Sequence, residues 1–143
     1  MESELRQHCM GIKEFISKDR FANFIGAELL EVADGAATTK LTIKEHHLNG
    51  VDITQGGVLF TLADLAFAAA ANSRGKVAVM LTSSASFIKA TVCGETIYAK
   101  ASEISLHKRI ATYHVEVTNA KDELIFTLEG TAYRKEIDIP LDK

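Results

Sequence analysis

The first part of the chain carries apolar positions at helical spacing. Apolar side chains recur every three or four residues between positions 3 and 19, which predicts one amphipathic helix. The stripe consists of Leu5, Cys9, Ile12, Phe15 and Ile16. Because such a helix buries its apolar stripe against a larger body, we expect it to lie on the rest of the domain.

The next segment changes to the two-residue period of a β-strand. Residues 27–32 are apolar and compatible with a strand. Thr39, Leu41 and Ile43 then alternate with polar neighbours, as in a strand with one buried face. Between these segments, Ala33-Asp34-Gly35 is typical of a hairpin turn. The pattern predicts a β-hairpin after the helix.

The longest apolar run follows, over residues 58–71. Only Thr61 and Asp64 interrupt it, and its content of Leu, Phe and Ala favours a helix over a strand. Ser73-Arg74-Gly75 supplies a typical helix end. The run is shorter than the roughly 20 apolar residues that span a bilayer. We therefore expect a core helix that is buried almost all round.

The second half of the chain is typical of β-structure. Strands are predicted at residues 77–88, 96–104, 110–118 and 124–133. The charged tail over residues 135–143 shows no period, and we expect it to be frayed. This order of elements predicts an α+β fold, in which one long antiparallel sheet wraps around a central buried helix. The length of 143 residues predicts a single domain over residues 1–143.

Composition and charge exclude several classes of protein. A formal net charge of -3 gives no general attraction for phosphate backbones, so we expect no nucleic-acid partner. The acidic start of the chain lacks the features of a secretory signal, and we expect a cytoplasmic protein that binds no membrane. Cys9 and Cys93 are isolated, as is typical of free thiols. No spacing of His or Cys predicts a metal site, and no cofactor motif occurs.

Asp64 is the residue that the apolar pattern explains least. A carboxylate inside a buried helix is costly unless it is paired, hydrogen-bonded or faces a cavity. Asp64 is therefore a candidate catalytic residue. A structural Asp that is satisfied by nearby donors is the alternative interpretation.

Gln55-Gly56-Gly57 stands where the central helix begins. A helix N-terminus offers unpaired N–H groups and a partial positive charge, both suited to a developing oxyanion. Eight residues separate Gly56 from Asp64, or about 12 Å along a helix axis, so one carbonyl cannot contact both groups of one chain. A two-fold axis between antiparallel helices would bring them together from two chains. The spacing thus predicts a homo-oligomer with sites between two copies.

The segment from Asn49 to Asp64 resembles the signature of hotdog-fold acyl-CoA thioesterases of the phenylacetic-acid-degradation (PaaI-like) type. Members of that family carry an Asn and a Gly, then His-Gly-Gly, then Leu-Ala-Asp on the central helix. Here the same order is formed by Asn49-Gly50, Gln55-Gly56-Gly57 and Leu62-Ala63-Asp64. The similarity extends from about residue 21 to residue 135 and includes Ala71-Asn72-Ser73, Phe87-Ile88-Lys89 and Gly130-Thr131-Ala132-Tyr133-Arg134-Lys135.

The resemblance implies an enzyme that hydrolyses a small or medium acyl-CoA, aryl or aliphatic, without a metal and usually as a tetramer of two dimers. By the same resemblance, Asp64 activates water or attacks the thioester, the Gly56 N–H polarises the carbonyl, and Asn49 helps to arrange the site. Gln55 departs from the family, which has His there: Gln forms hydrogen bonds but cannot take up a proton near neutral pH. Ala90 replaces a usual Pro, and we expect only a slightly altered strand end.

The sequence indicates further candidate substrate-binding residues less specifically. Gly57 adjoins the oxyanion donor. Thr82 and Ser84 share one strand face and could hydrogen-bond the carboxylate or the water, although an ordinary hydroxyl-rich strand is the alternative. Lys108 and Arg109 lie in a basic turn that could meet the phosphates of CoA, although hairpin turns are often charged for solvation alone.

Two other functions are weighed beside hydrolysis. A protein that binds acyl-CoA without turnover would explain Gln55 at the position of the family His. A hotdog dehydratase or hydratase would need a His that acts together with a carboxylate, and the absence of His at position 55 argues against it.

Overall fold

The computed structural model describes residues 1–141 and contains three α-helices, one short 3-10 helix and six strands. In chain order these are α1 (Glu2–Ile16), α2 (Arg20–Ile25), β1 (Glu28–Ala33), β2 (Ala36–Thr42), η1 (Glu45–His47), α3 (Gly56–Asn72), β3 (Lys76–Phe87), β4 (Thr96–Leu106), β5 (Ile110–Asn119) and β6 (Leu124–Asp138).

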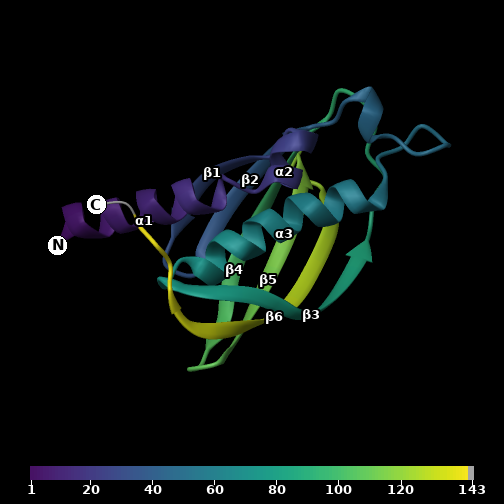
Figure 1. Ribbon diagram of the computed structural model, residues 1–143. Coiled ribbons are helices and arrows are strands. Elements are labelled where there is room, and N and C mark those ends of the chain that lie inside the picture. The colour runs from purple at the N-terminus through teal and green to yellow at the C-terminus, as the bar shows by residue number, and fades with distance from the viewer. Residues whose placement is uncertain (142–143) are drawn as a thin grey trace.

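The six strands form one antiparallel sheet in the order β1-β2-β4-β5-β6-β3. The sheet curls around α3, which lies along its concave face, while α1 and α2 cover the side of β1 and β2 (Figure 1). The two outer strands, β1 and β3, are the edges of the sheet. The predicted α+β architecture, with a long sheet around a central helix, is confirmed.

The core lies between α3 and the concave face of the sheet. Leu62, Ala63 and Ala66 of α3 are completely buried there. The ring of Phe67 packs edge-on against Tyr113 of β5, with ring centroids 5.4 Å apart. Small alanines let the helix lie close to the strands, which is why this helix can sit inside the curve of a single sheet.

Gly130 of β6 is the position where the helix approaches the sheet most tightly. A Cβ atom there would lie 2.6 Å from Cε2 of Phe67, whose ring is held in the core. We expect Gly130→Ala to lower the free energy of unfolding by about 1–3 kcal/mol, because overpacking forces a core side chain from its place. Urea titration would measure this change. Gly50→Ala is the control, since no atom lies within 4 Å of its Cβ position, and equal effects of both variants would contradict the prediction.

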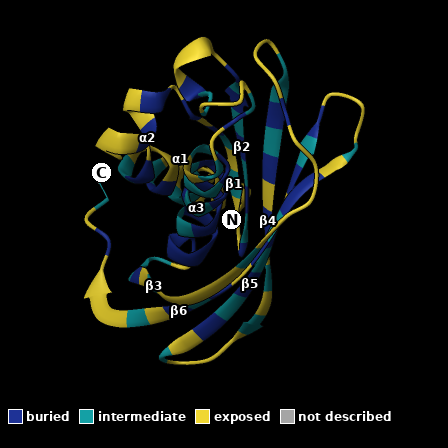
Figure 2. Cartoon of the chain, turned by 90° about the vertical axis from the view of Figure 1, so that its right-hand side faces the viewer, coloured by how far each residue is buried: buried dark blue, intermediate teal, exposed yellow. Residues whose placement is uncertain are grey.

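The central helix is not buried all round, contrary to the sequence-based expectation. Gly57 is exposed, and Phe60, Thr61, Asp64 and Ala68 are half-buried. These five residues, which we call the open stripe of α3, recur at helical spacing and face away from the sheet. In Figure 2, α3 lies between the α1–α2 layer and the curled β3–β6 pair. The sequence did not indicate this open stripe, because an apolar run is equally typical of a helix that is buried on every side. A single chain leaves the stripe uncovered.

The C-terminal end of the chain is more ordered than the sequence predicted. The expectation of a frayed tail is wrong for residues 135–141: β6 continues to Asp138, and the N–H of Ile139 donates to the carbonyl of Gly75 at 2.9 Å. Leu141 then packs against Gly11 of α1. Residues 142 and 143 lie outside the described part of the chain. These contacts join segments that are distant in sequence, so no local pattern could indicate them.

Among the described residues, every helix is too short or too polar to cross a membrane.

Candidate active site

Gly56 is the first residue of α3, and its N–H group is free to bind a ligand. Gln55 caps the helix: its side-chain oxygen accepts a hydrogen bond from the N–H of Gly57 at 2.6 Å. The N–H of Gly56 has no acceptor in the described structure. A Cβ atom at position 56 would lie 2.9 Å from Cε1 of Phe87, so glycine is needed for this close contact with the ring. The helix start therefore offers one free N–H beside an aromatic surface.

The segment that leads into α3 is clamped on both sides. On one side, the N–H of Thr54 donates to the carbonyl of Thr91 at 2.9 Å, and the two hydroxyl groups are 2.7 Å apart. On the other side, the N–H of Gln55 donates to the carbonyl of His47 at 2.9 Å. These bonds hold the backbone directly before the peptide that carries the Gly56 N–H.

Asp64 lies on the open stripe of α3, two turns after Gly56. Its carboxylate forms no hydrogen bond and no ion pair with any described residue. Burial raises the pKa of Asp64, and the negative charge of Asp19 at the start of α2 raises it further. A half-buried carboxylate with a raised pKa and no partner is a good proton acceptor, and it is costly to a protein that does not use it.

Gly56 and Asp64 do not meet within one chain. Both are on α3, eight residues apart, which corresponds to about 12 Å along the axis. The side chain of Asp64 projects from the open stripe, away from the sheet, where a neighbouring molecule could reach it.

Asn49 shapes the loop before α3. Its side-chain oxygen accepts hydrogen bonds from the N–H of Val51 at 2.9 Å and from the N–H of Ile53 at 3.3 Å. The loop projects beyond the body of the domain (Figure 1). Within one chain Asn49 thus supports the loop that precedes Gln55 and does not contact Asp64.

Thr82 and Ser84 lie on the wrong face of the sheet to contact Asp64 of their own chain. Ser83 pairs with Gly130, whose Cβ direction faces Phe67 in the core. Its neighbours Thr82 and Ser84 therefore face the convex side, where they line a hollow of about 550 Å³. The alternation predicted correctly that they share a face, but only the pairing with β6 decides which face it is.

Lys108 and Arg109 lie in the turn between β4 and β5, at the end of the sheet where α3 finishes. Arg134 holds this turn, because its Nη1 donates to the carbonyls of His107 at 2.9 Å and Lys108 at 3.2 Å. Arg109 forms an ion pair with Glu136, whereas Lys108 has no ion pair with the described residues. Lys108 is thus the more available cation of the two.

Three further residues contribute to this region: Phe87, Thr91 and Asp19. The sequence indicated Phe87 only within the segment that resembles the family, and it did not indicate Thr91. Phe87 reaches Gly56 from the far end of β3, and Thr91 reaches Thr54 from the loop after it. Asp19 could have been found, because an Asp followed by a short apolar segment and Gly26 is a typical start and end of a helix.

The cap formed by Gln55 leads to a stability prediction. Removing the oxygen that accepts the Gly57 N–H should lower the free energy of unfolding, and Gln55→Ala is expected to cost about 0.5–2 kcal/mol. Gln55→Ser keeps an oxygen that can cap the helix and should lose less. Chemical denaturation of the two variants beside the wild type checks this order, and equal stability of all three would show that the cap is unimportant.

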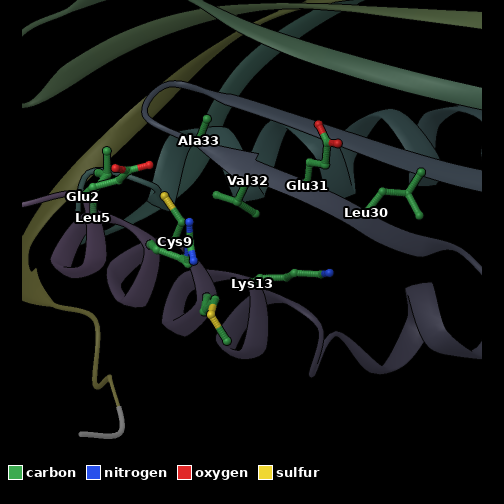
Figure 3. A pocket seen from close by; sticks show the side chains of 10 residues that line it. Glu2, Leu5, Cys9, Lys13, Leu30, Glu31, Val32 and Ala33 are labelled. Atoms are coloured by element: carbon green, nitrogen blue, oxygen red, sulfur yellow. The ribbon is translucent and has the colours of Figure 1, made fainter.

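A different hollow, of about 440 Å³, lies between α1 and β1 (Figure 3). Cys9 and Lys13 of α1 face Glu31 and Val32 of β1 across it. It contains none of the residues that the sequence indicated as a site, so the chemistry is assigned to the start and open stripe of α3.

A long antiparallel sheet curled around one central helix is the hotdog fold of thioester hydrolases. Comparison with known proteins agrees. Residues 53–126 match the family described as Thioesterase superfamily, and the chain belongs to this family.

Individual relatives show the same relationship. A protein of Archaeoglobus fulgidus named "Putative esterase" is 39% identical over 130 residues, which are 90% of this chain and 84% of that protein. The acyl-coenzyme A thioesterase PaaI of Escherichia coli K12 is 31% identical over 116 residues, 81% of this chain and 83% of that enzyme. The solved structure of E. coli PaaI has a TM-score of 0.90 at 27% identity and covers 95% of this chain and 99% of its own. The predicted PaaI-like hotdog thioesterase is confirmed.

Proposed function

We propose that this thioesterase hydrolyses a small or medium acyl-CoA, aryl or aliphatic, to the free acid and CoA. The observation that carries the proposal is the pair of unused groups on α3: the free N–H of Gly56 and the unpaired carboxylate of Asp64. Hydrolysis of a thioester needs an oxyanion donor and a base or nucleophile, and these two groups supply them. The similarity to acyl-coenzyme A thioesterase PaaI supports CoA as the thiol.

The site is shared between two chains. The free edge of β3 and the open stripe of α3 are adjacent uncovered surfaces, and Val79 and Leu81 on β3 are exposed apolar side chains. Pairing two β3 edges about a two-fold axis would continue the sheet and set two α3 helices antiparallel. Gly56 of one chain would then lie near Asp64 of the other. By the family resemblance, two such dimers associate as a tetramer.

In this arrangement the carbonyl oxygen of the thioester accepts a hydrogen bond from the Gly56 N–H. Asp64 of the second chain removes a proton from water as the water oxygen attacks the carbonyl carbon, or its own oxygen attacks and forms an anhydride that water then opens. The C–S bond breaks when the tetrahedral intermediate collapses, and CoA leaves as the thiol after the thiolate takes up a proton. The negative charge that develops on the carbonyl oxygen is stabilised by the N–H and the start of α3.

Phe87 forms the wall of the acyl site. Its ring touches the Cβ position of Gly56, packs edge-on against Phe126 with centroids 5.0 Å apart, and is 61% exposed. An acyl group whose carbonyl binds Gly56 would lie against this ring. Asn49 and Gln55 support the loop and the helix start, and Gly57 lies beside the carbonyl. Lys108, which forms no ion pair with the described residues, is the more available cation of the basic turn for a CoA phosphate.

The proposal is tested by thiol release from a panel of aryl and aliphatic acyl-CoAs, combined with subunit mixing. Asp64→Asn and Gly56→Pro should each be inactive. After the two are unfolded and refolded together, half of the dimers are hybrids, each with one intact site, so about one quarter of the wild-type activity should return. Sites formed within single chains would give no recovery, and that outcome would exclude the shared site.

A second function follows from the cap of α3. Because Gln55 already occupies the N–H of Gly57, only one N–H is free for a carbonyl, and the site could bind acyl-CoA without turnover. Isothermal titration with CoA and acyl-CoA, in the absence of any thiol release, would favour this binding role; rapid hydrolysis would exclude it.

A further inference from the structure

His47 is a buried histidine that the proposed chemistry does not use. It ends the 3-10 helix η1 and is 2% exposed. Its Nδ1 accepts a hydrogen bond from the N–H of Lys44 at 2.8 Å, so Nδ1 carries no proton. Its Nε2 then carries the proton and donates to the carbonyl of Ile25 at 2.7 Å. Both ring nitrogens are satisfied only in this neutral tautomer.

The ring of His47 joins segments that together hold the start of α3. Ile25 is the last residue of α2, and Lys44 follows β2. The carbonyl of His47 itself accepts the N–H of Gln55, the residue directly before Gly56. The imidazole therefore fixes the η1 backbone, and that backbone holds the peptide between Thr54 and Gln55, directly before the peptide that carries the Gly56 N–H. The carbonyl of that next peptide accepts the N–H of Val58 at 3.0 Å.

The other side of this segment is held by Thr91, through three hydrogen bonds with Thr54. A short segment clamped on both sides has little freedom to turn, which is what an oxyanion donor requires. Burial lowers the pKa of His47; the hydrogen bond to the Ile25 carbonyl opposes this, and the charges of His46 and Lys44 add to it, so that the pKa remains below its usual value. The neutral tautomer that both ring hydrogen bonds require is therefore favoured near neutral pH.

We propose that His47 is a positioning residue for thioester hydrolysis, which holds the peptide between Thr54 and Gln55 and thereby sets the course of the next peptide, whose Gly56 N–H is directed at the oxyanion. The inference rests on the proposed function. His47 touches no substrate, and it acts only through the backbone of Gln55. A shift of the donor by about 1 Å can lower a rate by about 100-fold, so loss of the ring should lower kcat much more than it changes substrate binding.

The test compares His47→Ala, His47→Asn and His46→Asn in the full-length oligomer. His47→Ala is expected to lower kcat by about 10- to 100-fold and to change KM by less than about twofold. His47→Asn keeps an oxygen near the position of Nδ1, so it should retain the bond from Lys44 and recover part of kcat. His46→Asn is the matched comparison, because the ring of His46 lies against that of His47, with centroids 4.2 Å apart, but is exposed and forms no hydrogen bond with the described residues. It removes this ring contact while both hydrogen bonds of His47 remain, so its kcat should stay close to that of the wild type.

A fall in kcat that results from lower stability must be distinguished from one that results from a displaced Gly56 N–H. Ile12→Val creates a small cavity at a fully buried position of α1, and it should destabilise the fold without lowering kcat. Amide hydrogen exchange gives a readout without substrate: the Gln55 N–H should exchange faster in His47→Ala than in Ile12→Val.

If the wild type hydrolyses acyl-CoA and the kcat of His47→Ala lies within twofold of the kcat of Ile12→Val, this inference alone is overturned. A wild type that hydrolyses no acyl-CoA would overturn the proposed function and this inference with it.

Discussion

Asp64→Asn is expected to abolish thioester hydrolysis while the oligomer persists. The substitution keeps the size of the side chain and removes the charge that accepts a proton or attacks the carbonyl. General base catalysis typically contributes about 100- to 10,000-fold, so kcat should fall by about 1,000-fold or more. Thiol release at saturating acyl-CoA measures this loss, and light scattering shows whether assembly is unchanged. Full activity of the variant would remove Asp64 from the mechanism.

The same substitution should make the protein more stable at neutral pH. Because the pKa of Asp64 is raised by burial, the folded protein binds this proton more tightly than the unfolded chain does. The contribution of this proton to stability is complete below the unfolded pKa, about 3.9, and is lost as pH rises through the raised folded pKa. An asparagine side chain has no carboxyl proton to lose, so the variant loses no stability through this position as pH rises. The Tm of Asp64→Asn should exceed that of the wild type at pH 7, and the difference should shrink in acid.

Gly56→Pro is expected to lower kcat by about 100- to 1,000-fold relative to Gly56→Ala, the range found when one oxyanion donor is removed. Proline has no N–H and fits the first position of a helix. Gln55 has φ -66 and ψ 137, an extended conformation that a following proline favours. The change therefore deletes the N–H of interest with little effect on the course of the backbone.

Gly56→Ala is the matched control for this deletion. Ala keeps the N–H, and both variants place a Cβ atom against Phe87, so any loss caused by moving that ring is common to the two. Thiol release from one acyl-CoA under identical conditions gives the ratio. Equal kcat values would show that the Gly56 N–H does not bind the oxyanion.

The fold was predictable where the sequence pattern was long and regular. The central helix was predicted over residues 58–71 and extends over Gly56–Asn72, because an unbroken apolar run admits little else. Its open stripe was not predicted, since Phe60 and Ala68 are as apolar as the residues that face the sheet. An apolar side chain does not reveal whether its own chain or another copy covers it.

The sequence indicated candidate site residues but not the contacts around them. Gly56 and Asp64 were indicated by a motif whose residues are close in sequence. The contacts of Phe87 with Gly56, and of Thr91 with Thr54, depend on where β3 and its following loop arrive in space. The sequence also did not show that Thr82 and Ser84 face the convex side of the sheet, because that face is set by the pairing of β3 with β6.

If two chains pair through β3 as proposed, the edge of this strand makes the lifetime of each newly made chain depend on the concentration of its partners. A twelve-residue strand with exposed Val79 and Leu81 is a template for any extended segment that it meets. At low concentration a newly made chain stays unpaired for longer and can aggregate or be degraded. At high concentration it pairs quickly with another copy of the chain. Dilution should thus reduce the thermal stability of this protein, and the cellular level of the protein should depend on its rate of synthesis more steeply than in proportion.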